Sequence, residues 1–299
     1  MGSGKHVRDR RCLRSRRSRI AVATLAFVAI LAIVLPTSII LTLRKDNGMG
    51  PKAKVFVPLY VYPAPGAWDP LVNVISAHPD VNFTVVVNPS SGPGPNVLPD
   101  GNYTRAVPRL AAHDNVRLLG YVPTTYAKRN VSLVRRDIET YAAWPTKSSN
   151  PDLAVRGIFF DETPQQYNAD DLAYLKELTS IVKSSPGFGP DNFVFHNPGV
   201  VPDYRYLSAA DSTVVFEETY DTFQERHGAK LFEEIQDSNR SQLCAVIHSV
   251  PDSVEGSELR RFVKQVRRVA DEVFITHLST DYYANFGRGW DEFVSLMAQ

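Results

Sequence analysis

The amino-acid sequence predicts a (β/α)8 TIM barrel of about 250 residues, preceded by a single N-terminal transmembrane helix. Eight short apolar runs rich in β-branched and aromatic residues recur along residues 55–299, and longer amphipathic runs separate them. Strands that are apolar throughout and alternate with helices indicate a parallel sheet, and eight such units are typical of a closed barrel. The transmembrane helix is predicted by an uncharged run over residues 20–43.

An arginine-rich segment opens the chain. Seven arginines lie between Arg8 and Arg19, and Asp9 is the one acidic residue among them. The uncharged run over residues 20–43 follows and is long enough to cross a hydrocarbon core of about 30 Å. Basic charge is denser before this run than after it, so residues 1–19 are expected to form a basic cytoplasmic arm.

The uncharged run is predicted to be a signal anchor. A cleaved signal peptide is the alternative, but its apolar region is usually shorter and ends in a small-x-small cleavage site, which we do not find after residues 20–43. We therefore expect a single-pass type II membrane protein, membrane-anchored through residues 20–43, with the residues after the span outside the cytoplasm. Residues 44–54 are predicted to be a linker, and residues 55–299 the barrel domain.

Charge divides the chain at the same place. Residues 1–50 hold 10 of the 33 lysines and arginines and 2 of the 32 acidic residues, which leaves 23 basic and 30 acidic side chains in the rest. An acidic domain argues against a nucleic-acid partner, because binding to phosphates needs positive patches. The same charge suits a neutral or cationic substrate.

The sequons also fit a domain outside the cytoplasm, while the cysteine content excludes a disulfide within it. The domain has a single cysteine, Cys244, so it cannot form an internal disulfide, and we expect this residue to be a small buried side chain. Four Asn-x-Ser/Thr sequons indicate passage through a secretory pathway. The predicted glycosylation sites are Asn82, Asn102, Asn130 and Asn239.

The predicted elements alternate along the whole domain. Strands are expected at residues 55–63, 82–89, 116–123, 157–162, 192–199, 212–218, 243–250 and 272–278. Helices are expected at residues 102–114, 132–144, 169–184, 231–236, 257–272 and 290–298, where apolar residues recur at helical spacing. An open doubly wound sheet is the alternative. It normally has a glycine-rich nucleotide-binding turn after its first strand, and VYPAPGAW (residues 61–68) is not such a turn.

Polar and aromatic residues follow almost every predicted strand. In a (β/α)8 barrel the active site lies at the C-terminal ends of the strands, so these residues should meet at one rim. In chain order they are Tyr60 and Tyr62; Asn88; Tyr121, Thr124 and Tyr126; Asp161 and Glu162; His196 and Asn197; Glu217, Glu218 and Tyr220; His248; and His277, Asp281, Tyr282 and Tyr283. Such a rim predicts a polar cleft that is able to hold a sugar.

Two pairs of adjacent carboxylates lie on this rim, at the ends of the fourth and sixth predicted strands. GIFFDETP (residues 157–164) supplies Asp161 and Glu162, and the sixth strand supplies Glu217 and Glu218. Two carboxyl groups about 5 to 10 Å apart are the usual machinery of glycosidases. Side chains alternate along a strand, so Asp161 and Glu162 can both face the cleft only if a bulge breaks the alternation. A simple helix cap remains the alternative for one of them.

Other chemistries fit the sequence less well. No histidine ends a strand before His196, and the first strand carries no ligand-type residue, so neither a metal nor another cofactor is expected. A Ser-His-Asp hydrolase would need a G-x-S-x-G turn after a strand, which is absent from the sequence. Trp68, Trp144 and Trp290 are interpreted as packing residues, whereas Tyr60, Tyr62, Tyr121 and Tyr220 are candidates for sugar-binding platforms.

The motifs together resemble a known family. VPLYVYP, FTVVVNPSSGPG, LLGYVPTTYAKR, GIFFDE, HNPG and VVFEETY, which span most of residues 55–250, resemble the spherulin-4 family of fungal and slime-mould surface proteins. The resemblance implies a (β/α)8 fold and a glycoside hydrolase that cuts α-1,4-linked N-acetylgalactosamine or galactosamine polymers such as fungal galactosaminogalactan. It also fits members that an N-terminal span anchors in the membrane, and the catalytic domain is then expected to be extracellular or to face the cell wall.

The resemblance implies roles for individual residues. Its catalytic acids correspond to Asp161, Glu162 and Glu217, all of which are acids here. The share of Glu218 stays open, because the alignment could shift by one residue. The resemblance also implies substrate contacts from Asn88, Ser90, Tyr121, His196, Asn197 and Tyr220. The positions at the strand ends add Tyr60, Glu218 and His248 to the expected substrate contacts.

Two functions are therefore weighed. The first is an endo-acting, endo-α-N-acetylgalactosaminidase-like hydrolase that uses carboxylates at the ends of strands four and six. The second is a non-catalytic carbohydrate-binding protein of the cell surface or of spherulation. The three acids favour the hydrolase, and the sequence leaves open whether it retains or inverts the anomeric configuration.

Overall fold

The computed structural model describes Met1, residues 51–226 and residues 238–299. Most of the predicted cytoplasmic arm, all of the predicted signal anchor, most of the linker and the helix expected over residues 231–236 lie outside these ranges and stay predictions. Within the described ranges, no helix combines the length and the apolar character needed to span a membrane.

The described residues form a closed barrel of eight parallel strands, and β8 pairs with β1. The strands are β1 (Lys54–Leu59), β2 (Phe83–Val87), β3 (Val116–Pro123), β4 (Gly157–Asp161), β5 (Phe193–Asn197), β6 (Ser212–Thr219), β7 (Leu243–His248) and β8 (Glu272–Ile275). All eight predicted strands are confirmed, and the open doubly wound sheet is excluded. The first strand ends earlier than expected, because Tyr60 donates its backbone N–H to the carbonyl of Tyr283 instead of to a neighbouring strand.

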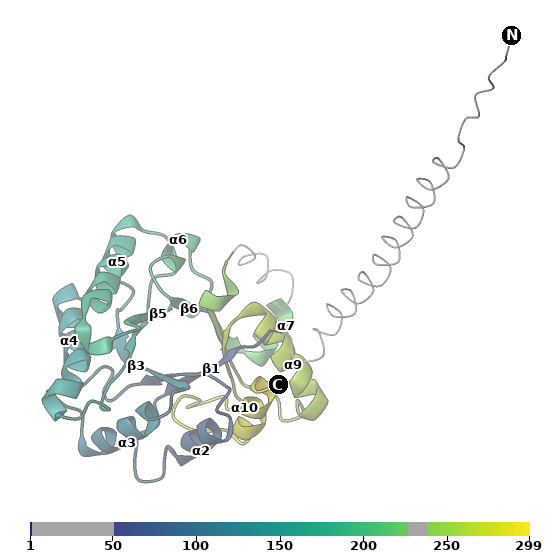
Figure 1. The fold of residues 1–299 in the computed structure, drawn as a ribbon, viewed down its shortest axis with the longest axis horizontal. Coiled ribbons are helices and arrows are strands. Elements are labelled where there is room, and N and C mark those ends of the chain that lie inside the picture. Colours follow the sequence, from purple (N-terminus) through teal and green to yellow (C-terminus); the bar gives the residue numbers. More distant parts are fainter. Residues whose placement is uncertain (2–50, 227–237) are drawn as a thin grey trace. The chain divides into compact units, whose positions relative to one another are not determined.

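Helices surround the barrel (Figure 1). They are α2 (Asp69–Ala77), α3 (Gly101–Ala111), α4 (Val131–Ser148), α5 (Ala169–Ser184), α6 (Tyr204–Leu207), α7 (Tyr220–Arg226), α9 (Gly256–Val269) and α10 (Trp290–Met297), with short 3₁₀ turns at η2 (Pro186–Phe188) and η3 (Arg240–Gln242). The sequence patterns missed α2, α6 and α7. The α2 sequence DPLVNVISA is rich in β-branched residues, which favour strands, and α6 is too short for a helical period.

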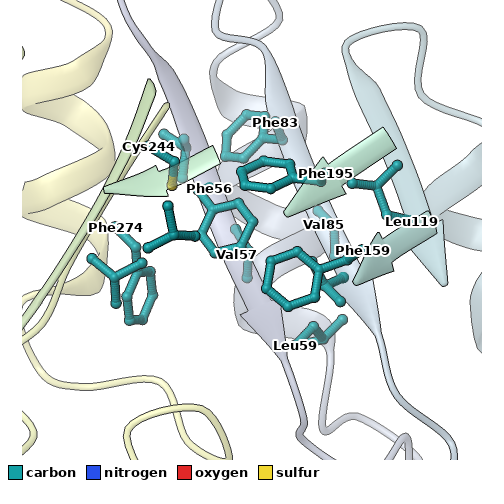
Figure 2. Packing of buried hydrophobic residues seen from close by; sticks show 14 of the residues in the cluster. Phe56, Val57, Leu59, Phe83, Val85, Leu119, Phe159, Phe195, Cys244 and Phe274 are labelled. Carbon is teal, nitrogen blue, oxygen red and sulfur yellow. The ribbon is translucent and has the colours of Figure 1, made fainter. Parts of the chain in front are cut away.

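Alternation along the strands fills the barrel interior. Phe56, Phe159 and Phe195 point inward from β1, β4 and β5, and their ring centroids lie 5.1 to 5.8 Å apart. Figure 2 shows the three rings together in the apolar core. Because successive inward side chains are two residues apart, Asp161 and Asn197 stand one step above this aromatic floor.

The tryptophans and the sequon asparagines differ in their burial, which bears on two predictions from the sequence. Trp68, Trp144 and Trp290 are buried, which confirms their packing role. Three sequon asparagines, Asn82, Asn130 and Asn239, are exposed, while Asn102 is half-buried and donates its Nδ2 to the Tyr62 hydroxyl at 2.8 Å. A glycan attaches to Nδ2, so modification of Asn102 would replace one of the two hydrogens on the nitrogen that makes this bond. Glycosylation stays a prediction.

Gly157 is expected to be essential for the pairing of β4 with β5. A Cβ atom at this position would collide with the backbone carbonyl oxygen of Phe193 and lie 2.6 Å from its nitrogen, so the two strands would have to separate. Gly157→Ala should therefore lower the free energy of unfolding by about 3 kcal/mol, measured by urea denaturation. Gly101→Ala is the control, since its Cβ would meet only the end of the flexible Arg105 side chain at 3.4 Å. Equal stability of the two variants would contradict this close approach.

Candidate active site

One amide group joins two of the predicted catalytic acids. Asn197 at the end of β5 lies opposite Asp161 at the end of β4. Its Nδ2 donates to Oδ1 of Asp161 and to Oε2 of Glu217, both at 2.9 Å. The other two carboxylate oxygens are also occupied, because Tyr121 donates its hydroxyl to Oδ2 of Asp161 at 2.7 Å and Tyr283 donates to Oε1 of Glu217. The two acids are thus held at fixed positions.

A bulge in β6 decides which glutamate faces the barrel. Val214 pairs with Cys244, but the next β7 residue, Ala245, pairs with Phe216, so one extra residue lies in β6 between them. Val214 and Glu217 therefore both point inward, although they are three residues apart. Without the bulge Glu218 would take the inward place. Of the two glutamates, Glu217 is therefore the one that faces the barrel interior.

Glu162 reaches the rim by a turn and not by a bulge. Strand β4 ends at Asp161, and Glu162 has a φ of +53°, in the left-handed region that side chains with a Cβ rarely adopt. Its carbonyl accepts hydrogen bonds from the Thr124 hydroxyl at 2.8 Å and from the Tyr126 N–H at 2.7 Å, which hold the turn. The Glu162 carboxylate has no hydrogen-bond partner among the described residues and is half-exposed. It is available to a ligand.

Three tyrosines enclose the acids. The Tyr60 ring meets Tyr121 and Tyr283 edge to face, with centroids 5.6 and 5.1 Å away. Burial, followed by the negative charge of Asp161, raises the pKa of Tyr60 and of Tyr121. Burial, followed by the negative charge of Glu217, also raises the pKa of Tyr283. All three phenols are therefore protonated at neutral pH, and those of Tyr121 and Tyr283 donate hydrogen bonds to the two acids.

Burial also changes the ionisation of Glu217. It raises the pKa of this carboxyl, and the hydrogen bonds from Tyr283 and Asn197 oppose the rise without cancelling it. The charge of Asp161 adds to the rise. A carboxyl of this kind keeps its proton to a higher pH than a free glutamate does, which is the property needed by a general acid.

Some predicted contacts lie at the edge of the site. Asn88 uses its Oδ1 to accept the N–H of Gly92 at 3.1 Å and so shapes the loop that exposes Ser90. His248 stacks on Tyr282 with centroids 4.4 Å apart. These residues border the rim, but no hydrogen bond joins them to Asp161 or Glu217.

Two predicted substrate contacts, His196 and Tyr220, lie outside the cleft. His196 alternates with Asn197 and points away from the cleft; its side chain is 2% exposed, and burial lowers its pKa to about 4. Tyr220 opens α7 and packs on Phe262 of α9, at 4.8 Å between centroids. A substrate in the cleft does not reach His196, and Tyr220 belongs to the helical layer.

Tyr283 is a site residue that sequence reasoning did not select. The pair Tyr282–Tyr283 follows the eighth strand, but nothing in its spacing links it to the sixth strand. The link is spatial, because the loop after β8 runs beside β1 and lays Tyr283 over Glu217. The aromatic residues after the last predicted strand are the feature of the sequence that could have indicated Tyr283 as a site residue.

Two hollows differ in their relation to the acids. A cavity of about 60 Å³ lies between the aromatic floor and the acids, bordered by Phe56, Phe159, Asp161 and Glu217 among others. It is too small for a sugar ring, so a sugar must bind above it. A larger hollow of about 380 Å³, beside Arg117, lies at the opposite ends of the strands, the face that serves stability in such barrels. Within residues 51–226 and 238–299, no cluster of three His, Cys, Asp or Glu side chains forms that could hold a metal ion.

Comparisons with known proteins agree with this architecture. Residues 54–297 match the family described as spherulation-specific family 4. The crystal structure of Aspergillus clavatus Sph3 in complex with GalNAc is 77% identical, covers 85% of this chain and 100% of that chain, and superposes with a TM-score of 0.83. An endo-β-1,4-mannanase from Thermotoga petrophila, at 9% identity, 85% and 77% coverage and a TM-score of 0.52, shares the fold alone.

Spherulin-4 of Physarum polycephalum is a more distant relative in sequence. It is 38% identical over 165 residues, which are 55% of this chain and 45% of the slime-mould protein. The match to this relative therefore spans less than half of its length. With the family matched over nearly the whole barrel domain, the chain belongs to the spherulin-4 family, spherulation-specific family 4.

Proposed function

We propose that this protein is a glycoside hydrolase that cuts within a polysaccharide of α-1,4-linked N-acetylgalactosamine or galactosamine. The observation that carries the proposal is the pair of carboxylates, Asp161 and Glu217, bridged by the Asn197 amide at the catalytic rim of the barrel. The presence of GalNAc in the crystal structure of the 77% identical Sph3 supports the choice of sugar.

The Asn197 bridge also limits how far apart the two bridged carboxylate oxygens of Asp161 and Glu217 can be. Each acid oxygen lies 2.9 Å from the same nitrogen, so the two oxygens are separated by at most about 5.8 Å. The two N–H bonds of an amide diverge by about 120°, which gives a separation of about 5 Å. Retaining glycosidases place their carboxyl groups about 5 to 5.5 Å apart, and inverting ones place them about 6.5 to 9.5 Å apart. The geometry supports a retaining mechanism.

The chemistry then takes two steps. Glu217, whose pKa burial raises, donates its proton to the glycosidic oxygen while Asp161 attacks the anomeric carbon, and the bond to the leaving sugar breaks. Glu217, now ionised, takes a proton from water, whose oxygen displaces Asp161 from the anomeric carbon. Tyr121 and Asn197 keep the attacking carboxylate aligned by hydrogen bonds.

Glu162 takes a supporting part in this proposal. Its carboxylate has no hydrogen-bond partner among the described residues, and it follows the attacking residue directly in the chain. It is placed to accept hydrogen bonds from sugar hydroxyl or amide groups. An additional negative charge there also favours the positive charge that develops on the sugar ring in the transition state.

Removing either bridged acid should abolish turnover. Asp161→Asn and Glu217→Gln should each lower kcat by about a thousandfold, measured as new reducing ends from purified N-acetylgalactosamine-containing polymer. Glu218→Gln, one residue from Glu217 but outside the Asn197 bridge, is the control and should keep most of the activity. Full activity in both acid variants would disprove the chemistry. Binding of the polymer by the unaltered protein, without product after long incubation, would favour the non-catalytic alternative.

The product should keep the α configuration of the substrate. If Asp161 forms a covalent intermediate, two inversions at the anomeric carbon restore the starting configuration. Proton NMR during the first minutes of hydrolysis should therefore show the α-anomer before mutarotation produces the β-anomer. Initial appearance of the β-anomer would mean that water attacks directly, and the separation inferred from Asn197 would then not describe the catalytic state.

Glu217 should also leave a mark on the pH dependence of stability. Its pKa is raised in the folded state, so between the ordinary glutamate pKa of about 4.3 and the raised pKa the folded protein holds a proton that the unfolded chain has released. Stability is therefore lost as the pH rises through this interval. Glu217→Gln removes the titrating group, so the variant does not lose this stability. Its free energy of unfolding relative to that of the unaltered protein should rise from pH 4 to pH 7, by about 1.4 kcal/mol for each pH unit by which folding raises the pKa of Glu217.

Urea denaturation at a series of pH values measures this difference. Tyr283→Phe provides a second comparison, because it removes a hydrogen bond that lowers the pKa of Glu217. The loss of stability with rising pH should then be larger than in the unaltered protein. A difference that stays constant with pH, or that favours Glu217→Gln more at pH 4, would contradict the buried-acid assignment.

A further inference from the structure

The exposed aromatic side chains gather at one end of the barrel. Among residues 51–226 and 238–299, the aromatic residues classed as exposed are Tyr62, Tyr126, Tyr167 and Tyr204, with exposed fractions of 51%, 50%, 41% and 74%. Each follows a strand, so all four lie at the rim that carries the acids. Aromatic rings left exposed on a single face indicate a binding surface.

Three of these tyrosines belong to consecutive loops that are bonded to one another. Tyr126, Tyr167 and Tyr204 follow β3, β4 and β5, which are neighbours in the barrel. The Tyr126 N–H donates to the Glu162 carbonyl at 2.7 Å, which joins the first loop to the second. The Asp203 N–H donates to the Gln165 carbonyl at 2.9 Å, which joins the second loop to the third. We name Tyr126, Tyr167 and Tyr204 the tyrosine arc.

The backbone around Tyr126 is strained. Thr125, Tyr126 and Ala127 have φ values of +50°, +53° and +63°, a left-handed turn that is unfavourable for residues with a Cβ. Two backbone hydrogen bonds close it, from Lys128 to Thr125 at 3.0 Å and from Arg129 to Thr124 at 3.1 Å. Strain of this kind persists where the surrounding structure enforces it, and it is concentrated at functional sites.

Tyr167 and Tyr204 stand on a rigid base. The Arg205 guanidinium lies 3.3 Å from the Tyr167 ring centroid and 5.6 Å from that of Tyr204. Asp203 accepts two hydrogen bonds of 2.7 Å from Arg205, which orient the guanidinium toward the two rings. The hydroxyl groups of the three arc tyrosines have no hydrogen-bond partner within the described residues. These hydroxyls are therefore not what holds the loops in place.

We propose that the tyrosine arc is a polysaccharide-binding surface that holds the substrate chain beyond the cleavage site, on the β3 to β5 side of the rim. Sugar rings carry apolar C–H faces that pack on aromatic rings, and fixed rings bind at little entropic cost. Tyr167 lies six residues after Asp161, so the two are within about 20 Å, a span of a few sugar units. The surface rests on the proposed function, since it needs a polymer as ligand.

Chain-length dependence tests the arc. Tyr126→Ala, Tyr167→Ala and Tyr204→Ala should each raise KM for the long N-acetylgalactosamine-containing polymer about threefold to tenfold. Their kcat, and their kcat/KM on a short oligosaccharide that fills only the cleavage site, should not change. In the inactive Glu217→Gln protein, the same substitutions should weaken retardation in gels that contain the polymer.

Two control variants match the arc substitutions. Tyr204→Phe keeps the ring and removes only an unbonded hydroxyl, so it should bind like the unaltered protein. Leu133→Ala removes a comparably exposed apolar side chain, 42% exposed on α4, and should have no effect. Circular dichroism of each variant establishes that it is folded, and Tyr204→Ala, at the most exposed position of the arc, provides the decisive comparison.

The possible outcomes separate this inference from the proposed function. Unchanged KM for the polymer in all three alanine variants would overturn the arc, even if hydrolysis is as proposed. Equal losses on short and long substrates would also overturn it, because the substitutions would then act on the cleavage site. Polymer binding that depends on the tyrosines in a protein that cleaves nothing would support the arc and refute the hydrolase. Loss of self-association with unchanged polymer binding would make it a protein interface and refute the proposal.

Discussion

Alternation of side chains in a closed barrel is the constraint on which the rest of the structure depends. Each strand can send only every second side chain inward, and Phe56, Phe159 and Phe195 use those places to fill the centre. The next inward residues of β4 and β5 are then Asp161 and Asn197. The rings thus support the polar layer and fix its height. Core packing and the position of the acids follow from the same period of two residues.

Two local exceptions to this alternation complete the site. The bulge in β6 moves Glu217 to the inward place that Glu218 would otherwise hold. The left-handed turn at Glu162 ends β4, so this residue is not restricted to the outer face. Both exceptions are held by backbone hydrogen bonds, from Glu217 to Gly199 and from Tyr126 to Glu162. Irregular backbone is thus found where the regular sheet could not present the acids.

The sequence predicted what depends on local pattern. Apolar runs identified all eight strands. The acids at the ends of β4 and β6 could be predicted to lie together, because residues at the C-terminal strand ends share a rim. What it missed depends on contacts distant in sequence. Neighbouring strands determine which side chains of β5 point inward, and this alternation places His196 outside the cleft. They also determine the bulge in β6. Tyr283 joins the site only because the end of the chain returns to Glu217. Short helices such as α6 lack a period from which to be predicted.

The Asn197 bridge explains why the two acids need different surroundings. An amide nitrogen only donates, so Asn197 favours the ionised form of both carboxyls and does not by itself distinguish an acid from a nucleophile. For Glu217 the difference comes from burial, which raises its pKa against two hydrogen bonds that lower it. The same bridge keeps the acids close while the proton moves. In the proposed mechanism, Asn197 therefore sets the distance between the acids, and the buried environment of Glu217 determines its role as the acid.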